Sequence, residues 1–162
     1  MNAHGVTLNK CIPLALERLE SGDATLDEVD RELFPFFDEE AQAELKAIEV
    51  SLHAWDHTPS PLRELGRQFH TLKGAANSIG HLRIGSLAGA MKDLLEQINP
   101  AHSFVLRLQI IKTNIQVIGT IRALLQESRM PEHNQVKKEQ IVAAVQSILN
   151  LQKIEMNLSG TS

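Results

Sequence analysis

The segment RQFHTLKGAANSIG, residues 67–80, predicts an amphipathic helix with a histidine at the edge of its buried face. From Leu62 onward, apolar residues recur every three or four positions, which is the pattern of one buried helical stripe. His70 falls about 100° around the helix from Phe69, and therefore at the water-facing edge of that stripe. The predicted stripe consists of Leu62, Leu65, Phe69, Leu72, Ala76 and Ile79.

The same edge also carries small and polar residues. Gly66, Lys73, Gly74 and Asn77 share it with His70, because steps of three and four residues bring helical side chains together. A glycine inside a helix costs about 1 kcal/mol relative to alanine, so helices that keep glycines usually gain close approach by another element or molecule. The segment therefore indicates a binding or reaction site, and Gly80 is expected to end the helix as its C-cap.

The composition favours a soluble helical domain. The chain has 162 residues, enough for one sizeable domain, and its aromatic content of 4% requires an aliphatic core, which suits helix-on-helix packing. A net charge of -4 without a basic run argues against a nucleic-acid partner. Cys11, the single cysteine, excludes an internal disulfide and favours a cytoplasmic location. No apolar run approaches the roughly 20 residues that span a bilayer, and no signal peptide is recognised, so we expect no membrane insertion.

Long amphipathic segments with short connections predict an all-α fold, an antiparallel up-down four-helix bundle with an additional helix at each end. No segment alternates as a strand would. The expected bundle helices span about 34–56, 61–80, 83–98 and 103–128, the N-terminal helix about 12–20, and the C-terminal helix about 135–156.

Three units are expected along the chain. Residues 1–30 form an accessory N-terminal segment, residues 31–130 the bundle, and residues 131–162 a helix that packs on the bundle, followed by a disordered tail. Thr25 and Glu28 match a capping box, and Ser60 and Ser103 match helix caps. Two groups are expected in the core: Phe34, Phe36 and Phe37, and the stripe Phe104, Leu108, Ile111, Ile115, Ile118 and Leu125, which is also wide enough for dimerisation.

The pattern His70-Thr71-Leu72-Lys73-Gly74, with Gly80 ten positions after the histidine, resembles the signature of the histidine-containing phosphotransfer (HPt) family. The resemblance extends from about Phe34 to Leu125. The chain looks most like the phosphotransfer domains of chemotaxis-type and twitching-motility-type histidine kinases. This resemblance implies a bundle that carries a phosphoryl group on His70, to or from an aspartate of a receiver domain, and that has no kinase activity of its own.

The resemblance also implies a role for each residue of the motif. Histidine is nucleophilic near pH 7 because its unperturbed pKa is about 6.5, and Nε2 of His70 is the expected phosphoacceptor. Lys73, one turn further on, is expected to neutralise the phosphoryl charge. We expect no cofactor in this chain and Mg²⁺ in the partner receiver domain, while a histidine kinase catalytic domain is a second candidate partner. The surface expected to contact the receiver consists of Gly66, Arg67, Thr71, Gly74, Asn77, Ser78 and Lys92.

Lys92 departs from the family pattern. Members often place a glutamine or glutamate twenty-two positions after the histidine, where it accepts a hydrogen bond from Nδ1–H. Lysine cannot accept such a bond, so Lys92 either adds a second positive charge near the phosphate or points into solvent. Without an orienting acceptor the imidazole is less fixed, and we expect slower transfer or a less stable phosphohistidine than in relatives that have one.

Two other functions are compatible with parts of the sequence. A helical scaffold that binds signalling partners without carrying phosphate is favoured by Lys92, while the intact motif from His70 to Gly74 weighs against it. A hydrolase built on His70 or on the pair His53 and His57 lacks a nucleophile or carboxylate constellation, and that pair lacks a third metal ligand. The sequence leaves open the partner, the direction of transfer, the oligomeric state, and whether the chain is a free protein or part of a larger kinase.

Overall fold

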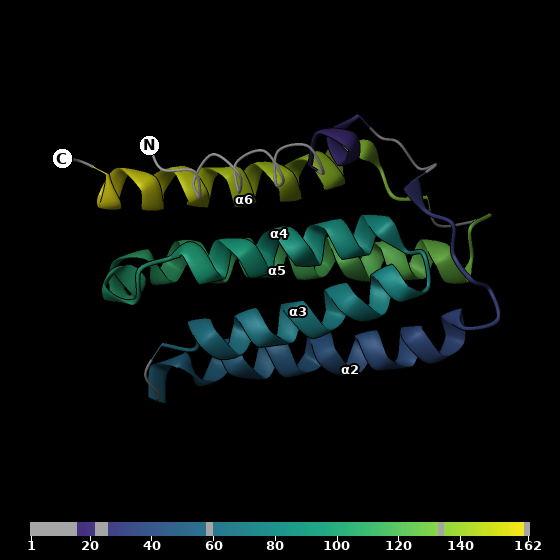
Figure 1. The fold of residues 1–162 in the computed structure, drawn as a ribbon, viewed down its shortest axis with the longest axis horizontal. Coiled ribbons are helices and arrows are strands. Elements are labelled where there is room, and N and C mark those ends of the chain that lie inside the picture. Colours follow the sequence, from purple (N-terminus) through teal and green to yellow (C-terminus); the bar gives the residue numbers. More distant parts are fainter. Residues whose placement is uncertain (1–15, 22–25, 58–59, 133–134, 161–162) are drawn as a thin grey trace.

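A computed structural model describes residues 16–21, 26–57, 60–132 and 135–160, and every regular element in these ranges is helical. Figure 1 shows the arrangement of the long helices. The elements are α2 (Phe34–His53), the 3-10 helix η2 (Ala54–His57), α3 (Leu62–Ser78), α4 (Leu82–Gln97), the 3-10 helix η3 (Pro100–His102), α5 (Ser103–Arg129) and α6 (Lys138–Ser159).

Helices α2 to α5 form an antiparallel bundle, and α6 packs on α4 and α5 at the side away from α2 and α3 (Figure 1). The closest pair is α3 with α4. The predicted stripe of α3 is buried throughout, with Leu65 and Phe69 completely inaccessible. The predicted all-α bundle is confirmed. Within the described ranges, no helix combines the length and apolarity needed to cross a bilayer.

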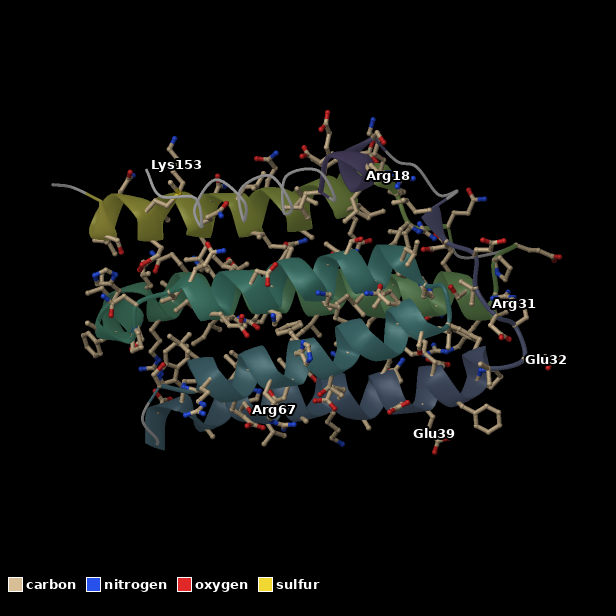
Figure 2. The ribbon with its side chains drawn as sticks, viewed as in Figure 1. Arg18, Arg31, Glu32, Glu39, Arg67 and Lys153 are labelled. Atoms are coloured by element: carbon tan, nitrogen blue, oxygen red, sulfur yellow. The ribbon has the colours of Figure 1, made fainter. Side chains whose placement is uncertain are left out.

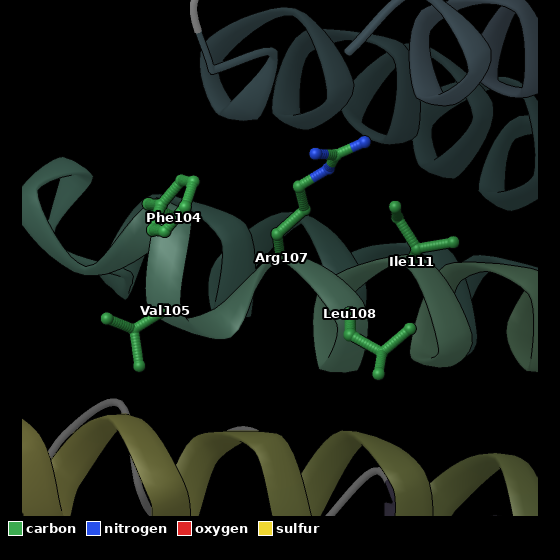
Figure 3. A pocket seen from close by; sticks show the side chains of 5 residues that line it. All are labelled: Phe104, Val105, Arg107, Leu108 and Ile111. Carbon is green, nitrogen blue, oxygen red and sulfur yellow. The ribbon is translucent and has the colours of Figure 1, made fainter. Parts of the chain in front are cut away.

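The predicted core stripe of α5 is partly wrong. Phe104, Leu108 and Ile115 are 84%, 58% and 60% exposed, and the first two line an open pocket on the outer side of the helix (Figure 3). A competing stripe that includes Leu106 and Ile110 faces the core instead. Two polar residues on that face bond to their own helix, with Asn114 Nδ2 donating to the carbonyl of Ile110 at 2.8 Å and Thr120 Oγ1 donating to the carbonyl of Gln116 at 2.9 Å. The buried face consists of Leu106, Ile110, Thr113, Asn114, Val117, Ile118, Thr120, Ile121, Leu124 and Leu125.

The expected phenylalanine cluster is also only partly correct. Phe34 and Phe37 are buried one turn apart on α2, whereas Phe36 is 71% exposed. The physical reason is helical geometry, since a residue two positions after Phe34 points about 200° away from it.

Several predictions for the chain ends and caps are modified. Residues 16–20 are helical, with Leu16 and Leu19 buried, while the rest of the expected helix over 12–20 lies outside the described residues. Thr25 also lies outside them, and Glu28 starts no helix because residues 27–30 are irregular. The last helix continues to Ser159, and residues 161–162 of the expected tail are not described.

The predicted helix caps differ from the structure at both positions, because the N-cap residues are Pro61 for α3 and His102 for α5. Ser103 is the first residue of α5 rather than its cap, and its hydroxyl donates to the carbonyl of Pro100 at 2.7 Å. Ser60 accepts a long hydrogen bond of 3.4 Å from the backbone N–H of Leu62, where α3 begins.

The turn between α3 and α4 is held by the segment that precedes α2. Gly80 has a φ of +82°, as expected of a C-cap, and a Cβ there would collide with the carbonyl oxygen of Glu28. That carbonyl belongs to a short backbone pairing, in which Glu28 N–H donates to Gly80 O at 2.9 Å and Asp30 N–H donates to Ile79 O at 2.8 Å. Only glycine fits this turn without strain.

A buried polar cluster lies beside this turn. The imidazole of His81 is inaccessible, with Nε2 at 2.8 Å from Ser128 Oγ and Nδ1 at 3.5 Å from Asp27 Oδ2. Arg83 donates to Asp27 from its backbone N–H at 2.8 Å and from Nε at 2.7 Å, and it donates to Glu127 from Nη2. The cluster therefore joins the segment before α2 to the start of α4 and the end of α5.

Trp55 lies at the opposite end of the bundle. It is 7% exposed, and the guanidinium of Arg107 stacks 5.8 Å from the centre of its ring. Arg107 also forms an ion pair with Asp56. These contacts join the end of α2 to the start of α5.

Candidate functional site

His70 lies in the middle of α3 at the exposed edge of the helix. The neighbouring positions Phe69 and Leu72 are 0% and 1% exposed, so the backbone beneath the imidazole is fixed by the core. The side chain of His70 is exposed and has no hydrogen-bond or ion-pair partner among the described residues. Both ring nitrogens are therefore open to an incoming group.

Small residues set the alignment of α3 against α4. A Cβ at Gly85 would overlap the amide of Asn77, and a Cβ at Gly89 would lie 3.2 Å from Cδ of Lys73. The side chains of α3 therefore lie across the glycines of α4. Glycine at these two positions therefore leaves room for the α3 side chains.

A third contact extends the same alignment. A Cβ at Gly66 would lie 3.8 Å from Cγ of Glu96. Because the helices are antiparallel, each step forward along α3 corresponds to a step back along α4. The pairs 66/96, 73/89 and 77/85 thus share one alignment, and it places Lys92 opposite His70.

Lys92 pairs with carboxylates of its own helix. Its Nζ lies 3.3 Å from Glu96 Oε1 and 3.6 Å from Asp93 Oδ1, and its side chain is 21% exposed. The sequence left two alternatives for Lys92, a second positive charge near the phosphate or a side chain that points into solvent. Neither describes the structure fully, because two acids hold the ammonium group at the helix surface. Glu96 is a site residue that the sequence analysis missed, although its spacing of four residues from Lys92 is typical of a helical ion pair.

Lys73 presents a cation one turn after His70. Its aliphatic stem lies over Gly89, and its ammonium group has no ion-pair partner within the part of the chain that the structure describes. The side chain is only half-buried, so the charge remains available to a bound anion.

Gly74 leaves the outer side of α3 open. A Cβ at this position would meet no heavy atom within 4 Å. The neighbouring hydroxyls bond to their own helix, with Thr71 donating to the carbonyl of Arg67 at 3.2 Å and Ser78 donating to the carbonyl of Ala75 at 2.8 Å. At Gly74 this face therefore offers an open approach, while Arg67 lies further along it.

Arg67 borders the site on the side of α2 (Figure 2). It donates to Glu64 from Nη2 at 2.5 Å and from Nε at 3.1 Å, and this hydrogen bond lowers the pKa of Glu64. On α2, burial raises the pKa of Glu44. The positive charge of Arg67 acts to lower this pKa, and the negative charge of Glu64 acts to raise it. Arg67 is thus occupied by acids and is not aimed at His70.

The expected contact residues consequently fall into two groups. Gly66, Asn77 and Lys92 lie at the α3–α4 interface, whereas Arg67, Thr71, Gly74 and Ser78 form the outer face of α3. The structure shows where these residues lie, and their part in binding stays a prediction. Among the described residues, no group of three or more His, Cys, Asp or Glu side chains could hold a metal ion.

Comparison with models of known protein families matches residues 19–130 to the Hpt domain. The matched region contains α2 to α5, His70 and the polar cluster at the α3–α4 turn, and it covers more than half of the chain. Comparisons with curated proteins and with solved structures give no significant match.

Proposed function

The chain belongs to the Hpt domain family, and on that premise we propose that His70 is the residue that carries its phosphoryl group. Family membership implies histidine phosphotransfer in a phosphorelay. The observation that carries the assignment to His70 is its exposed imidazole, which has no partner among the described residues and has Lys73 one turn away. By contrast, His81 is buried, and Nδ1 of His102 lies 2.5 Å from Glu155.

The proposed partner is the receiver domain of a response regulator. The lone pair of Nε2 attacks the phosphorus of an aspartyl phosphate; the N–P bond forms as the bond between phosphorus and the aspartyl oxygen breaks, and the aspartate leaves as a carboxylate. Lys73 offsets the negative charge on the phosphoryl oxygens. The bundle contributes mainly position, because phosphoryl transfer needs in-line geometry more than covalent assistance. Transfer in the opposite direction uses the same arrangement.

Docking is proposed on the outer face of α3, centred on Gly74. The open space at this glycine lets the receiver's active site approach His70 without displacing a side chain. The Mg²⁺ that such a reaction uses is assigned to the receiver, since the ammonium group of Lys73, which has no ion-pair partner among the described residues, would repel a metal ion beside His70. A histidine kinase catalytic domain, such as those of the chemotaxis or twitching-motility type, would use the same exposed imidazole.

The assignment is tested by phosphorylating the purified chain with phosphoramidate and, separately, with phosphorylated receiver domains. We expect an acid-labile, alkali-stable label on the wild type and only background label on His70→Gln. His53→Gln is the matched control, because His53 is another exposed histidine, and it should be labelled like the wild type. Thermal unfolding should be unchanged in both variants.

Two outcomes would contradict the proposal. Label that persists in His70→Gln would move the phosphoacceptor elsewhere. A folded wild type that accepts no label from any donor would favour the second candidate, a scaffold that binds signalling partners, for which the missing hydrogen-bond acceptor at Lys92 is the specific observation.

A further inference from the structure

We propose that Lys92 is a second phosphate-binding cation at His70, and that Glu96 holds it while His70 is unmodified and releases it to the phosphoryl group after transfer. This inference rests on the proposed phosphotransfer function. It assigns to Glu96 a positioning role that acts through Lys92.

The first support is location. The aligned pairs 66/96, 73/89 and 77/85 place Lys92 directly opposite His70 across the α3–α4 interface. Lys73 lies on the same side of α3, over Gly89. A phosphoryl group on His70 would therefore lie between two lysines, one from each helix.

The second support is charge. In the unmodified protein, Lys92 Nζ pairs with two carboxylates among the described residues, Glu96 at 3.3 Å and Asp93 at 3.6 Å. A phosphoryl group carries close to two negative charges near pH 7, and its oxygens form stronger charge-assisted hydrogen bonds than neutral acceptors do. Phosphorylation therefore offers Lys92 a partner with more charge than either carboxylate.

The third support is the weakness of the existing pair. The side chain of Glu96 is 56% exposed, and ion pairs at such exposed positions are weak because water screens them. Lys92 is less exposed, at 21%, which keeps its ammonium group near the interface rather than in open solvent. Exchange of partner thus needs only a side-chain movement of Lys92.

Glu96 occupies a position that suits this role. Its side chain lies near Gly66, one turn before His70 on α3, at 3.8 Å from the place that a Cβ would occupy there. From there Glu96 reaches back to Lys92 one turn along α4. The pair should therefore set how strongly phosphate is held at His70, with Lys92 favouring the phosphorylated form and Glu96 favouring the unmodified one.

The test measures the equilibrium constant for phosphoryl transfer between the full chain and one phosphorylated receiver domain that labels it. Glu96→Gln should shift the equilibrium toward phosphorylated His70 by about two- to fivefold, the range that a weak ion pair supplies. Lys92→Gln should shift it the other way by a similar factor, and Lys92→Arg should resemble the wild type. In the Lys92→Gln background, Glu96→Gln should have no effect, because it acts through the lysine.

Two matched variants control for net charge. Glu39→Gln on α2 and Lys112→Gln on α5 remove exposed charges of the same sign outside the α3–α4 interface, and they should leave the equilibrium constant unchanged. As a second readout, the NMR signal of the Lys92 side chain should shift on phosphorylation of the wild type and should not shift in His70→Gln.

The outcomes separate this inference from the function on which it rests. A wild type without label contradicts the phosphotransfer function itself. A labelled wild type whose equilibrium constant is insensitive to both substitutions overturns the exchange of Lys92 alone. An effect of Glu96→Gln that persists in full without Lys92 also overturns it, because Glu96 would then act by direct repulsion.

Discussion

His70 and His81 lie eleven residues apart, on either side of Gly80, and their imidazoles have opposite environments in the fold. His70 is exposed, and its ring has no partner among the described residues. His81 is inaccessible and packs beside the rings of Phe34 and Phe37, whose centres are 6.4 Å and 6.2 Å away. One nitrogen of His81 is bonded to Ser128, and the other faces Asp27.

A reacting histidine and a structural histidine place different requirements on the bundle. A reacting imidazole needs a fixed backbone and free nitrogens, which the middle of α3 provides because its other face is buried. A buried imidazole needs polar partners, because a buried polar group without one costs about 1–3 kcal/mol. In His81, Nε2 has the hydroxyl of Ser128, while Nδ1 faces the carboxylate of Asp27 at 3.5 Å without a hydrogen bond. The turn at Gly80 divides these environments.

Replacement of His81 should cause the largest loss of stability. His81→Gln removes ring packing against Phe34 and Phe37 and disturbs the bond to Ser128, so the free energy of unfolding should fall by about 3 kcal/mol. Labelling of His70 should persist under conditions where the variant is folded. Urea unfolding measures the loss, with His53→Gln as control, and a change below 0.5 kcal/mol (roughly the scatter for surface substitutions) would show that His81 is not structural.

Removing the carboxylate beside His81 should have a smaller effect. Burial acts to raise the pKa of Asp27, but the hydrogen bonds and charges of His81 and Arg83 outweigh it and hold that pKa below its ordinary value. Asp27 therefore stabilises the fold above its unfolded pKa of about 3.9, and this contribution is lost as the pH falls through the lowered folded value. Asp27→Asn should reduce the free energy of unfolding by about 2 kcal/mol at pH 7.

The pH dependence supplies the check on this substitution. Urea unfolding of wild type and Asp27→Asn at several pH values should show their difference shrinking below about pH 4. A difference that stays constant from pH 7 to pH 3 would mean that the lost contacts do not depend on the charge of Asp27.

The smallest effect on stability is expected at Gly74, one turn after His70. Gly74→Leu fills open space, so it should raise the free energy of unfolding by up to about 1 kcal/mol through helix propensity. Transfer from a receiver domain should slow by about tenfold, equivalent to about 1.4 kcal/mol in the barrier, because the leucine obstructs docking. Labelling by phosphoramidate should be unaffected, since this donor is small; equal slowing with both donors would argue against a docking role.

The sequence predicts the region around His70 well because the relevant signals are local. The apolar periods of α3 and α4, the cap at Gly80 and the small residues at Gly85 and Gly89 all act within one helix or between neighbouring helices. The exposure of His70 follows from its angle to Phe69. The site roles of Lys73 and Gly74 stay predictions.

The environment of His81 could not be predicted in the same way. Its partners Asp27 and Ser128 are far away in sequence. For a histidine at a turn, the local sequence pattern does not indicate whether the side chain is buried or solvated. On α5, apolar residues occur around most of the helix, so periodicity alone did not choose between Phe104 and Leu106. That choice depends on which face α2, α4 and α6 cover.

The buried environment of Trp55 gives the protein an intrinsic fluorescence signal for unfolding. The chain contains one tryptophan and no tyrosine, so its intrinsic emission comes almost entirely from one indole, buried beside Arg107 where α2 ends. The turn between α3 and α4, which the polar cluster around His81 adjoins, lies at the other end of the bundle from the end of α2 (Figure 1). Fluorescence and circular dichroism recorded on one sample would therefore reveal whether the two ends melt together or separately, without any label.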